Sequence, residues 1–147
     1  MKSAEWYVGD RAESLAIELF TREGRFKLVS RQVGEFGIDL VFVTSRTHYR
    51  SRLGVEVKGF DSAKQSPHSV RLKESIRSYV NRLRFPVILL VVDVRMDTFK
   101  YSWLRKHDSQ HGSLTKCPHS ATLVDLDIST VDGIAIALGK MKRYASL

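Results

Sequence analysis

Two stretches, GIDLVFV at residues 37–43 and GVEVKG at residues 54–59, decide how this sequence is interpreted. Both have the apolar, partly β-branched composition of buried strands. Each nevertheless carries charge, with Asp39 in the first stretch and Glu56 and Lys58 in the second. Charged side chains are costly in a buried strand unless they are paired or bind an ion. The two stretches therefore predict a sheet and a site on it.

The spacing of these charges predicts that they share one surface. Alternate side chains of a strand lie on the same face, so Glu56 and Lys58 point the same way. If the two strands pair antiparallel through the basic turn at residues 46–52, Asp39 near the start of one lies opposite the end of the other. The sequence leaves the register of this hairpin open.

Two neighbouring carboxylates repel each other, and a divalent cation that takes both as ligands removes that cost. Mg²⁺ prefers such oxygen ligands and keeps other positions for water and phosphate oxygens. We therefore expect Asp39 and Glu56 to bind Mg²⁺ or Mn²⁺, with Lys58 beside the phosphate or the attacking water. The alternative is an ordinary ion pair of Lys58 with one of the two acids at a sheet edge.

The rest of the chain alternates helical and strand patterns around these stretches, without a repeat or a linker. This pattern predicts an α/β or α+β sandwich in which helices cover a mixed sheet. The last strand before the polar loop at 106–120 is expected at a sheet edge, and Ser129 or Thr130 is expected to cap the final helix. The expected elements are a helix over 9–23, strands over 25–32, 37–45 and 52–60, a helix over 69–84, strands over 86–94, 99–104 and 121–127, and a helix over 129–144.

Length and composition predict one cytoplasmic domain over residues 1–147. Hydrophobic residues make up 43% of the chain and charged residues 27%, which is an ordinary balance for a globular protein. The longest apolar run, residues 86–94, has the length of a strand rather than of a membrane span. The N-terminus does not resemble a secretory signal, and the single cysteine cannot form an intrachain disulfide.

The net charge predicts a polyanionic partner, with nucleic acid favoured over a membrane. Lys and Arg number 24 against 16 Asp and Glu, which gives a formal net charge of +8. The alternative is that positive charge only keeps the protein soluble. The residues expected to contact nucleic acid are Arg46, Arg50, Arg52, Lys64, Arg71, Lys73 and Arg77.

Three short motifs carry a resemblance to a known family: GDRAE at 9–13, GID at 37–39 and VEVK at 55–58. Over about residues 9–94 the chain resembles the PD-(D/E)XK nuclease superfamily, including small bacterial and phage members and archaeal Holliday junction resolvases. The resemblance implies a restriction-endonuclease-like three-layer α/β/α sandwich with a mixed central sheet. Its core order is helix, three strands, helix and strand, which extra strands and a C-terminal helix would follow here. The proline of the superfamily name is absent, since Ile38 precedes the aspartate.

The resemblance also implies roles for individual residues. Asp39, Glu56 and the backbone carbonyl of Val57 would bind Mg²⁺ or Mn²⁺, and Lys58 would orient the water and stabilise charge in the transition state. Glu13 would support the metal from the first helix, whereas its alternative role is that of a first-turn acid favoured by the helix dipole. The expected activity is metal-dependent hydrolysis of DNA, without an organic cofactor or a membrane, and many relatives cut as homodimers.

Other functions remain open from the sequence. The same fold could serve as a non-catalytic nucleic-acid-binding or assembly module, or as a structural or inhibitory partner in a larger complex. The sequence does not distinguish DNA from RNA, nor the pathway. His107, His111, Cys117 and His119 are residue types that bind zinc, but their spacing matches no standard zinc motif, and a polar surface loop is the better interpretation.

Overall fold

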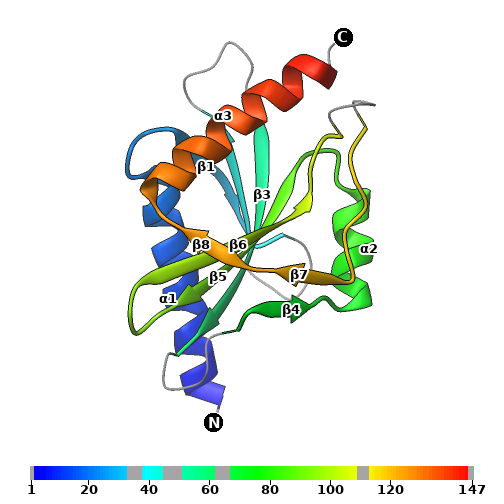
Figure 1. The fold of residues 1–147 in the computed structure, drawn as a ribbon. Helices are drawn as coiled ribbons and strands as arrows, with labels where there is room; N and C mark the ends of the chain where they lie inside the picture. The colour runs from blue at the N-terminus through cyan, green and yellow to red at the C-terminus, as the bar shows by residue number, and fades with distance from the viewer. Residues whose placement is uncertain (1, 33–37, 45–50, 62–66, 109–112, 146–147) are drawn as a thin grey trace.

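The computed structural model describes residues 2–32, 38–44, 51–61, 67–108 and 113–145 (Figure 1). Within these ranges the chain forms three helices and eight strands. In chain order they are α1 (Lys2–Thr21), β1 (Phe26–Arg31), β2 (Leu40–Thr44), β3 (Arg52–Phe60), β4 (Ser69–Arg71), α2 (Glu74–Arg82), β5 (Val87–Asp93), β6 (Thr98–Arg105), β7 (Ser120–Thr122), β8 (Val124–Leu126) and α3 (Ile128–Ala145).

The central sheet has six strands in the order β1-β2-β3-β5-β6-β8. Strands β1, β2 and β3 pair antiparallel in sequence order, and β5 pairs parallel to β3 after the crossover through α2. Strands β6 and β8 continue antiparallel from β5. The predicted α/β fold with a mixed sheet is therefore confirmed.

Helices cover both faces of this sheet, with α1 and α2 on opposite sides of it in Figure 1. The face under α1 and α3, which we call the α1 face, buries one core that includes residues of both helices. The opposite face, which we call the α2 face, buries a second core under α2 and the two-stranded β4–β7 sheet. The sheet is thus the shared middle layer of two cores.

The α1 face is formed around aromatic side chains. Phe20 of α1 stacks on Phe42 of β2 with ring centroids 5.0 Å apart, and Phe26 of β1 meets Phe20 edge-on at 5.4 Å. The helix begins at Lys2, seven residues before the expected start at residue 9, and ends before Gly24, whose φ of +70° fits the expected glycine stop. The aromatic cluster fixes α1 against β1 and β2.

Strand β5 is the centre of the molecule, and every one of its residues is buried. Its terminal Asp93 is buried as well, which would be costly without partners. The carboxylate accepts hydrogen bonds from the backbone N–H groups of Arg95 and Met96, at 3.0 and 3.2 Å. This acid therefore closes the β5–β6 turn.

Two predicted boundaries are wrong because β4 and β7 pair with each other. The segment Ser69–Arg71, expected as the first turn of a helix over 69–84, pairs antiparallel with Ser120–Thr122 instead, and α2 begins at Glu74. The expected strand over 121–127 divides at Leu123, whose backbone N–H donates to the His68 carbonyl at 3.0 Å. Its halves, β7 and β8, belong to different sheets.

Two further predictions about the C-terminal third are wrong. Strand β6 is not an edge strand, because β8 pairs with it through the register Phe99↔Leu126. The cap of α3 is Asp127 rather than Ser129 or Thr130, since its Oδ1 accepts the Thr130 backbone N–H at 2.9 Å and the hydroxyls of both predicted residues. Within the described part of the chain, no helix is both long and apolar enough to cross a membrane.

Candidate active site

The β2–β3 hairpin brings Asp39 and Glu56 into contact. The two strands pair antiparallel in the register Leu40↔Val55 and Val41↔Gly54, so one further step places Asp39 opposite Glu56. Their carboxyl groups share a hydrogen bond. The sequence left the register of this hairpin open, and the observed register places the two acids side by side. We call Asp39 and Glu56 the acidic pair.

The acidic pair lies on the α2 face of the sheet. Val55 and Val57, the neighbours of Glu56 in β3, pack into the core of the α1 face. Because alternate side chains of a strand point to opposite faces, Glu56 and Lys58 point toward the α2 face. Both are half-buried, as is Asp39.

Backbone groups on both sides hold Asp39 in place. The backbone N–H of Val57 donates to Asp39 Oδ2 at 2.8 Å, and the N–H of Gln32 donates to the Asp39 carbonyl at 3.0 Å. In a strand the N–H and C=O of one residue leave on the same side. The Val57 carbonyl, expected as a metal ligand, therefore leaves β3 toward Asp39.

Burial and mutual repulsion raise the pKa values of both acids. Desolvation raises the pKa of Asp39, against the Val57 hydrogen bond, which lowers it. The pKa of Glu56 rises to about 8, first through burial and then through the charge of Asp39, while Lys58 lowers it. Burial and the proximity of the two carboxyl groups therefore favour a proton on the acidic pair near neutral pH.

Lys58 acts on Glu56 through its charge rather than through an ion pair. It lies two residues beyond Glu56 on the same face, about 7 Å along the strand. Within the described residues it makes no ion pair with either acid. The alternative of a simple lysine–carboxylate bridge is therefore not seen, and the ammonium group remains available to a ligand.

Glu13 lies near the acidic pair but is held by an arginine that the sequence analysis missed. Its Oε2 accepts a hydrogen bond from Arg31 Nη2 at 3.2 Å, and the same nitrogen donates to Asp10 Oδ1 at 3.1 Å. Burial raises the pKa of Glu13, Arg31 lowers it, and the charge of Asp39 raises it further. No motif could have identified Arg31, because its role depends on how α1 packs beside β1.

The donor set suits a small, hard cation. Mg²⁺ is commonly held by one or two carboxylates and completes its shell with water or phosphate oxygens. Asp39, Glu56 and the Val57 carbonyl could supply three such oxygens, and a dication would replace the proton that the two acids share. Within the described residues, no group of three or more His, Cys, Asp or Glu side chains could hold a metal ion, so Glu13 does not join the pair as it stands.

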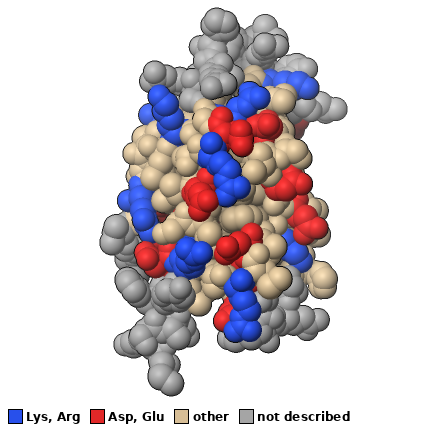
Figure 2. Space-filling model, turned by 90° about the vertical axis from the view of Figure 1, so that its left-hand side faces the viewer, with Lys and Arg blue, Asp and Glu red and all other residues tan. Residues whose placement is uncertain are grey.

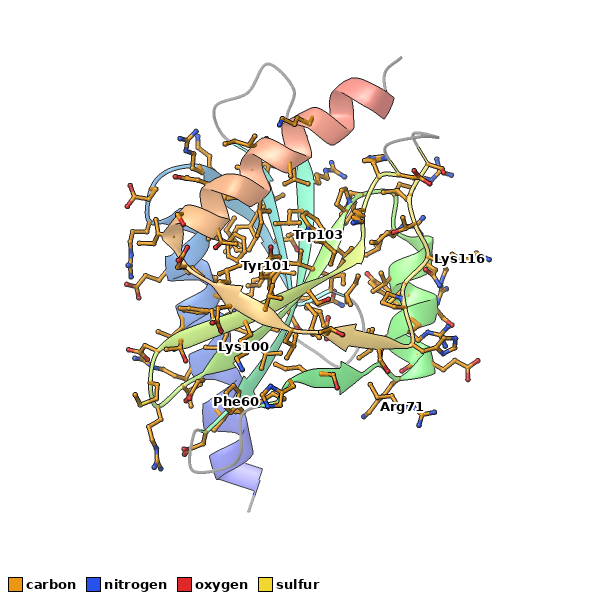
Figure 3. The ribbon with its side chains drawn as sticks, viewed as in Figure 1. Phe60, Arg71, Lys100, Tyr101, Trp103 and Lys116 are labelled. Carbon is orange, nitrogen blue, oxygen red and sulfur yellow. The ribbon has the colours of Figure 1, made fainter. Side chains whose placement is uncertain are left out.

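The predicted nucleic-acid contacts are only partly described. Arg46, Arg50 and Lys64 lie outside the described residues. Arg52, Arg71 and Lys73 are exposed, and Arg77 is half-buried. Figure 3 shows Arg71 at the α2 side of the molecule, directed away from the sheet.

Charges on the α1 face are arranged differently. Figure 2, which views the molecule from the side of α1, shows Lys and Arg interleaved with Asp and Glu. Many of them pair: the ion pairs around α1 and α3 are Arg11–Asp97, Arg22–Glu18, Arg25–Asp132, Arg31–Asp10 and Arg31–Glu13. This mixed surface offers no continuous positive face to a polyanion.

The possible zinc ligands do not converge in the described part of the chain. Cys117 is buried and its backbone N–H donates to Asn81 Oδ1 at 2.7 Å, while His119 Nε2 lies 3.1 Å from Arg77 Nη2. His111 lies outside the described residues. The geometry therefore gives no support to a zinc site.

Comparison of the chain with protein-family models, with curated proteins and with solved structures found no match. The functional argument therefore depends on the site itself.

Proposed function

We propose that the protein is a metal-dependent endonuclease that hydrolyses phosphodiester bonds of DNA, on a restriction-endonuclease-like fold of the PD-(D/E)XK type. The observation that carries this proposal is the contact between Asp39 and Glu56 on one face of the sheet, with Lys58 on the same face. Acids placed in contact with raised pKa values are typical of functional sites.

The order of elements supports the fold assignment. The chain runs from α1 through the antiparallel strands β1, β2 and β3 to α2 and then to β5, which is parallel to β3. This is the helix, three strands, helix and strand that the resemblance implies, with β4 as an added short strand. Asp39 immediately precedes the second strand, β2, and Glu56 lies in the third strand, β3, which is consistent with the proposed assignment.

Each residue of the site has a physical task in phosphodiester hydrolysis. Mg²⁺ or Mn²⁺ would polarise the phosphate and lower the pKa of bound water. Asp39 is oriented for binding by the Val57 N–H, and Glu56 releases its proton when it becomes a ligand. Lys58 supplies an ammonium group to the developing negative charge on phosphate oxygens. Glu13 supports the site from α1 when Arg31 releases it.

The test is cleavage of supercoiled, linear and branched DNA with Mg²⁺, with Mn²⁺ or with a chelator. We expect metal-dependent cutting that Asp39→Asn, Glu56→Gln and Lys58→Ala each reduce by about 100-fold or more. Asp10→Asn is the matched control, because it removes an acid that binds the same Arg31 outside the acidic pair. Equal cutting by all variants would contradict the proposal.

A non-catalytic nucleic-acid-binding module is the second candidate. It is favoured by the hydrogen bond between Glu13 and Arg31, because among the described residues it leaves Asp39 and Glu56 without a third acid to complete a metal site. Salt-sensitive DNA binding without cutting, unchanged by Asp39→Asn and Lys58→Ala, would support the module instead.

A further inference from the structure

Two arginines from different elements converge on the segment 113–119, beside α2. Arg77 comes from the middle of α2, and Arg105 is the last residue of β6. Both lie close enough to Cys117 for their charges to lower the pKa of its thiol. We call Arg77 and Arg105 the arginine pair.

Each guanidinium is oriented by the segment that it contacts. Arg105 Nη1 donates to the Thr115 carbonyl at 2.8 Å. Arg77 Nη2 lies 3.1 Å from His119 Nε2, and because a guanidinium can only donate, this histidine nitrogen accepts. Since a guanidinium carries five N–H donors, both arginines retain donors for a ligand.

Segment 113–119, which orients the two arginines, is itself hydrogen-bonded to α2 on one side and toward β6 on the other. The backbone N–H of Cys117 donates to Asn81 Oδ1 on α2 at 2.7 Å. Toward β6, the Thr115 N–H donates to the Lys106 carbonyl at 2.8 Å, and the Lys106 N–H donates to Thr115 Oγ1 at 3.1 Å. The arginine pair is therefore preorganised by bonds to its own surroundings.

The arginine pair has no anionic partner among the described residues. The Nε atoms of both Arg77 and Arg105 are buried there without an acceptor, and neither guanidinium is in an ion pair. The thiol of Cys117 does not supply the charge, because burial raises its pKa more than the arginines lower it. Arginine stays protonated in proteins, so two partly desolvated cations lie near Cys117 without a compensating anion among the described residues.

We propose that Arg77 and Arg105 form a phosphate-binding subsite that holds one backbone phosphate of a nucleic acid. Planar guanidinium groups bind phosphate oxygens through paired N–H donors, which supplies the missing anion. The positions of the two guanidinium groups point to a phosphate whether or not the protein cuts DNA. Only the assignment of that phosphate to a polynucleotide rests on the proposed function.

The surroundings favour a polynucleotide over a free anion. Arg71, Lys73 and Lys116 are exposed, and Figure 3 shows Arg71 and Lys116 on the α2 side of the molecule. Strand β5 alone separates β3, which carries Glu56, from β6, which carries Arg105, so these two strands lie roughly 10 Å apart across the sheet.

The test measures binding of fluorescently labelled duplex DNA by anisotropy over a salt series, in chelator so that no cutting occurs. We expect Arg77→Gln and Arg105→Gln each to weaken binding about tenfold and to reduce the slope of log K against log salt by about 0.9, the value for one phosphate. The double variant should lose the same ~0.9 rather than ~1.8, because both arginines bind one phosphate.

Arg82→Gln is the matched control, since Arg82 is exposed on the same helix and its Nε donates to the Ser78 carbonyl at 3.3 Å. It should leave the slope unchanged. Arg105→Lys, which keeps the charge but loses the paired donors, should bind between Arg105→Gln and the parent. Circular dichroism of each variant, matching the parent, confirms that the fold is retained.

The shared subsite would be overturned if the double variant lost the sum of the two single slope losses. It would also be overturned if Arg77→Gln and Arg105→Gln changed the slope no more than Arg82→Gln does. Inorganic phosphate tests the other source: if it perturbs the Arg77 and Arg105 Nε–H signals in NMR while the DNA slope stays unchanged, the site takes a free anion and the proposal fails. Because the assay contains chelator, it can succeed when the Asp39→Asn cleavage test fails, and the two failures remain distinguishable.

Discussion

The two faces of the central sheet are constructed differently. The α1 face is covered by two long helices and contains the cluster of Phe20, Phe26 and Phe42. The α2 face is covered by the nine-residue α2 and the two-stranded β4–β7 sheet, and its buried core is mainly aliphatic. The aromatic rings of the α1 face bury more area per side chain. The α2 face leaves room for charged groups beside its core.

The charges differ as well. Around α1 several arginines pair with carboxylates, whereas on the α2 side two acids with raised pKa values lie together, and Arg77 and Arg105 have no anionic partner among the described residues. Like charges placed together cost free energy unless a ligand compensates them. Under the two proposals, the ligands that compensate these charges bind on the α2 face.

The largest expected effect is on the aromatic cluster. Phe42→Ala should lower the free energy of unfolding by about 4 kcal/mol, since it removes a fully buried ring and leaves a cavity. Val80→Ala, at a fully buried position of α2, should cost only about 2 kcal/mol. Urea denaturation measures both values, and an equal cost at the two sites would remove the energetic difference between the faces.

A smaller effect is expected where α1 approaches β3. A Cβ at Gly59 would lie 2.8 Å from the Val8 carbonyl oxygen and 2.9 Å from the Ala12 side chain. Gly59→Ala should therefore displace α1, at a cost of about 1–3 kcal/mol, and reduce cleavage through the shift of Glu13. Gly9→Ala is the control: its Cβ meets nothing within 4 Å, and alanine in a helix should stabilise by about 0.5–1 kcal/mol. Thermal unfolding measures both effects. Changes in melting temperature of the same sign for Gly59→Ala and Gly9→Ala would contradict this packing.

The acidic pair predicts an unusual pH dependence for the metal-free protein. Burial raises the pKa of Glu56 from its ordinary value of 4.5 to about 8, so the folded state binds more protons between these values. Stability should then fall as pH rises from about 5 to about 8, by on the order of 2 kcal/mol. Glu56→Gln should flatten the dependence, and Mg²⁺ should bind more tightly as the pH rises. Melting curves that are level across this range in the parent protein would rule out the shared proton.

The smallest effect is expected from charge on the α1 face. Arg22→Gln removes an exposed ion pair with Glu18 and should change the free energy of unfolding by less than about 0.5 kcal/mol. It should also leave DNA affinity within about twofold, whereas Lys73→Gln on the α2 side should reduce the salt dependence of binding. Equal losses in an anisotropy titration would show that DNA does not distinguish the two faces.

Much of the site could be predicted from strand periodicity and one hairpin. Alternation assigns Glu56 and Lys58 to one face, and an antiparallel return brings Asp39 to the same end. The register could not be predicted, because it depends on how Phe42 and Leu53 pack in the core. The structure supplies that register, and with it the contact between the acids.

The misses have a common physical cause in long-range contacts. Segment 69–71 appears helical by local pattern but pairs with β7, 49 to 53 residues further along the chain. Arg31 becomes a partner of Glu13 only through the packing of α1 beside β1, and Arg105 meets Arg77 only through the 113–119 segment. Local patterns carry no information on such pairings.

The most direct test of the account is a crystal structure of the protein soaked in Mn²⁺, with the ion located by its anomalous scattering. The account predicts one ion bound by the carboxylates of Asp39 and Glu56 and by the Val57 carbonyl, with Lys58 beside it. An acidic pair that stays in mutual contact without an ion at saturating Mn²⁺, or an ion bound only elsewhere, would contradict it.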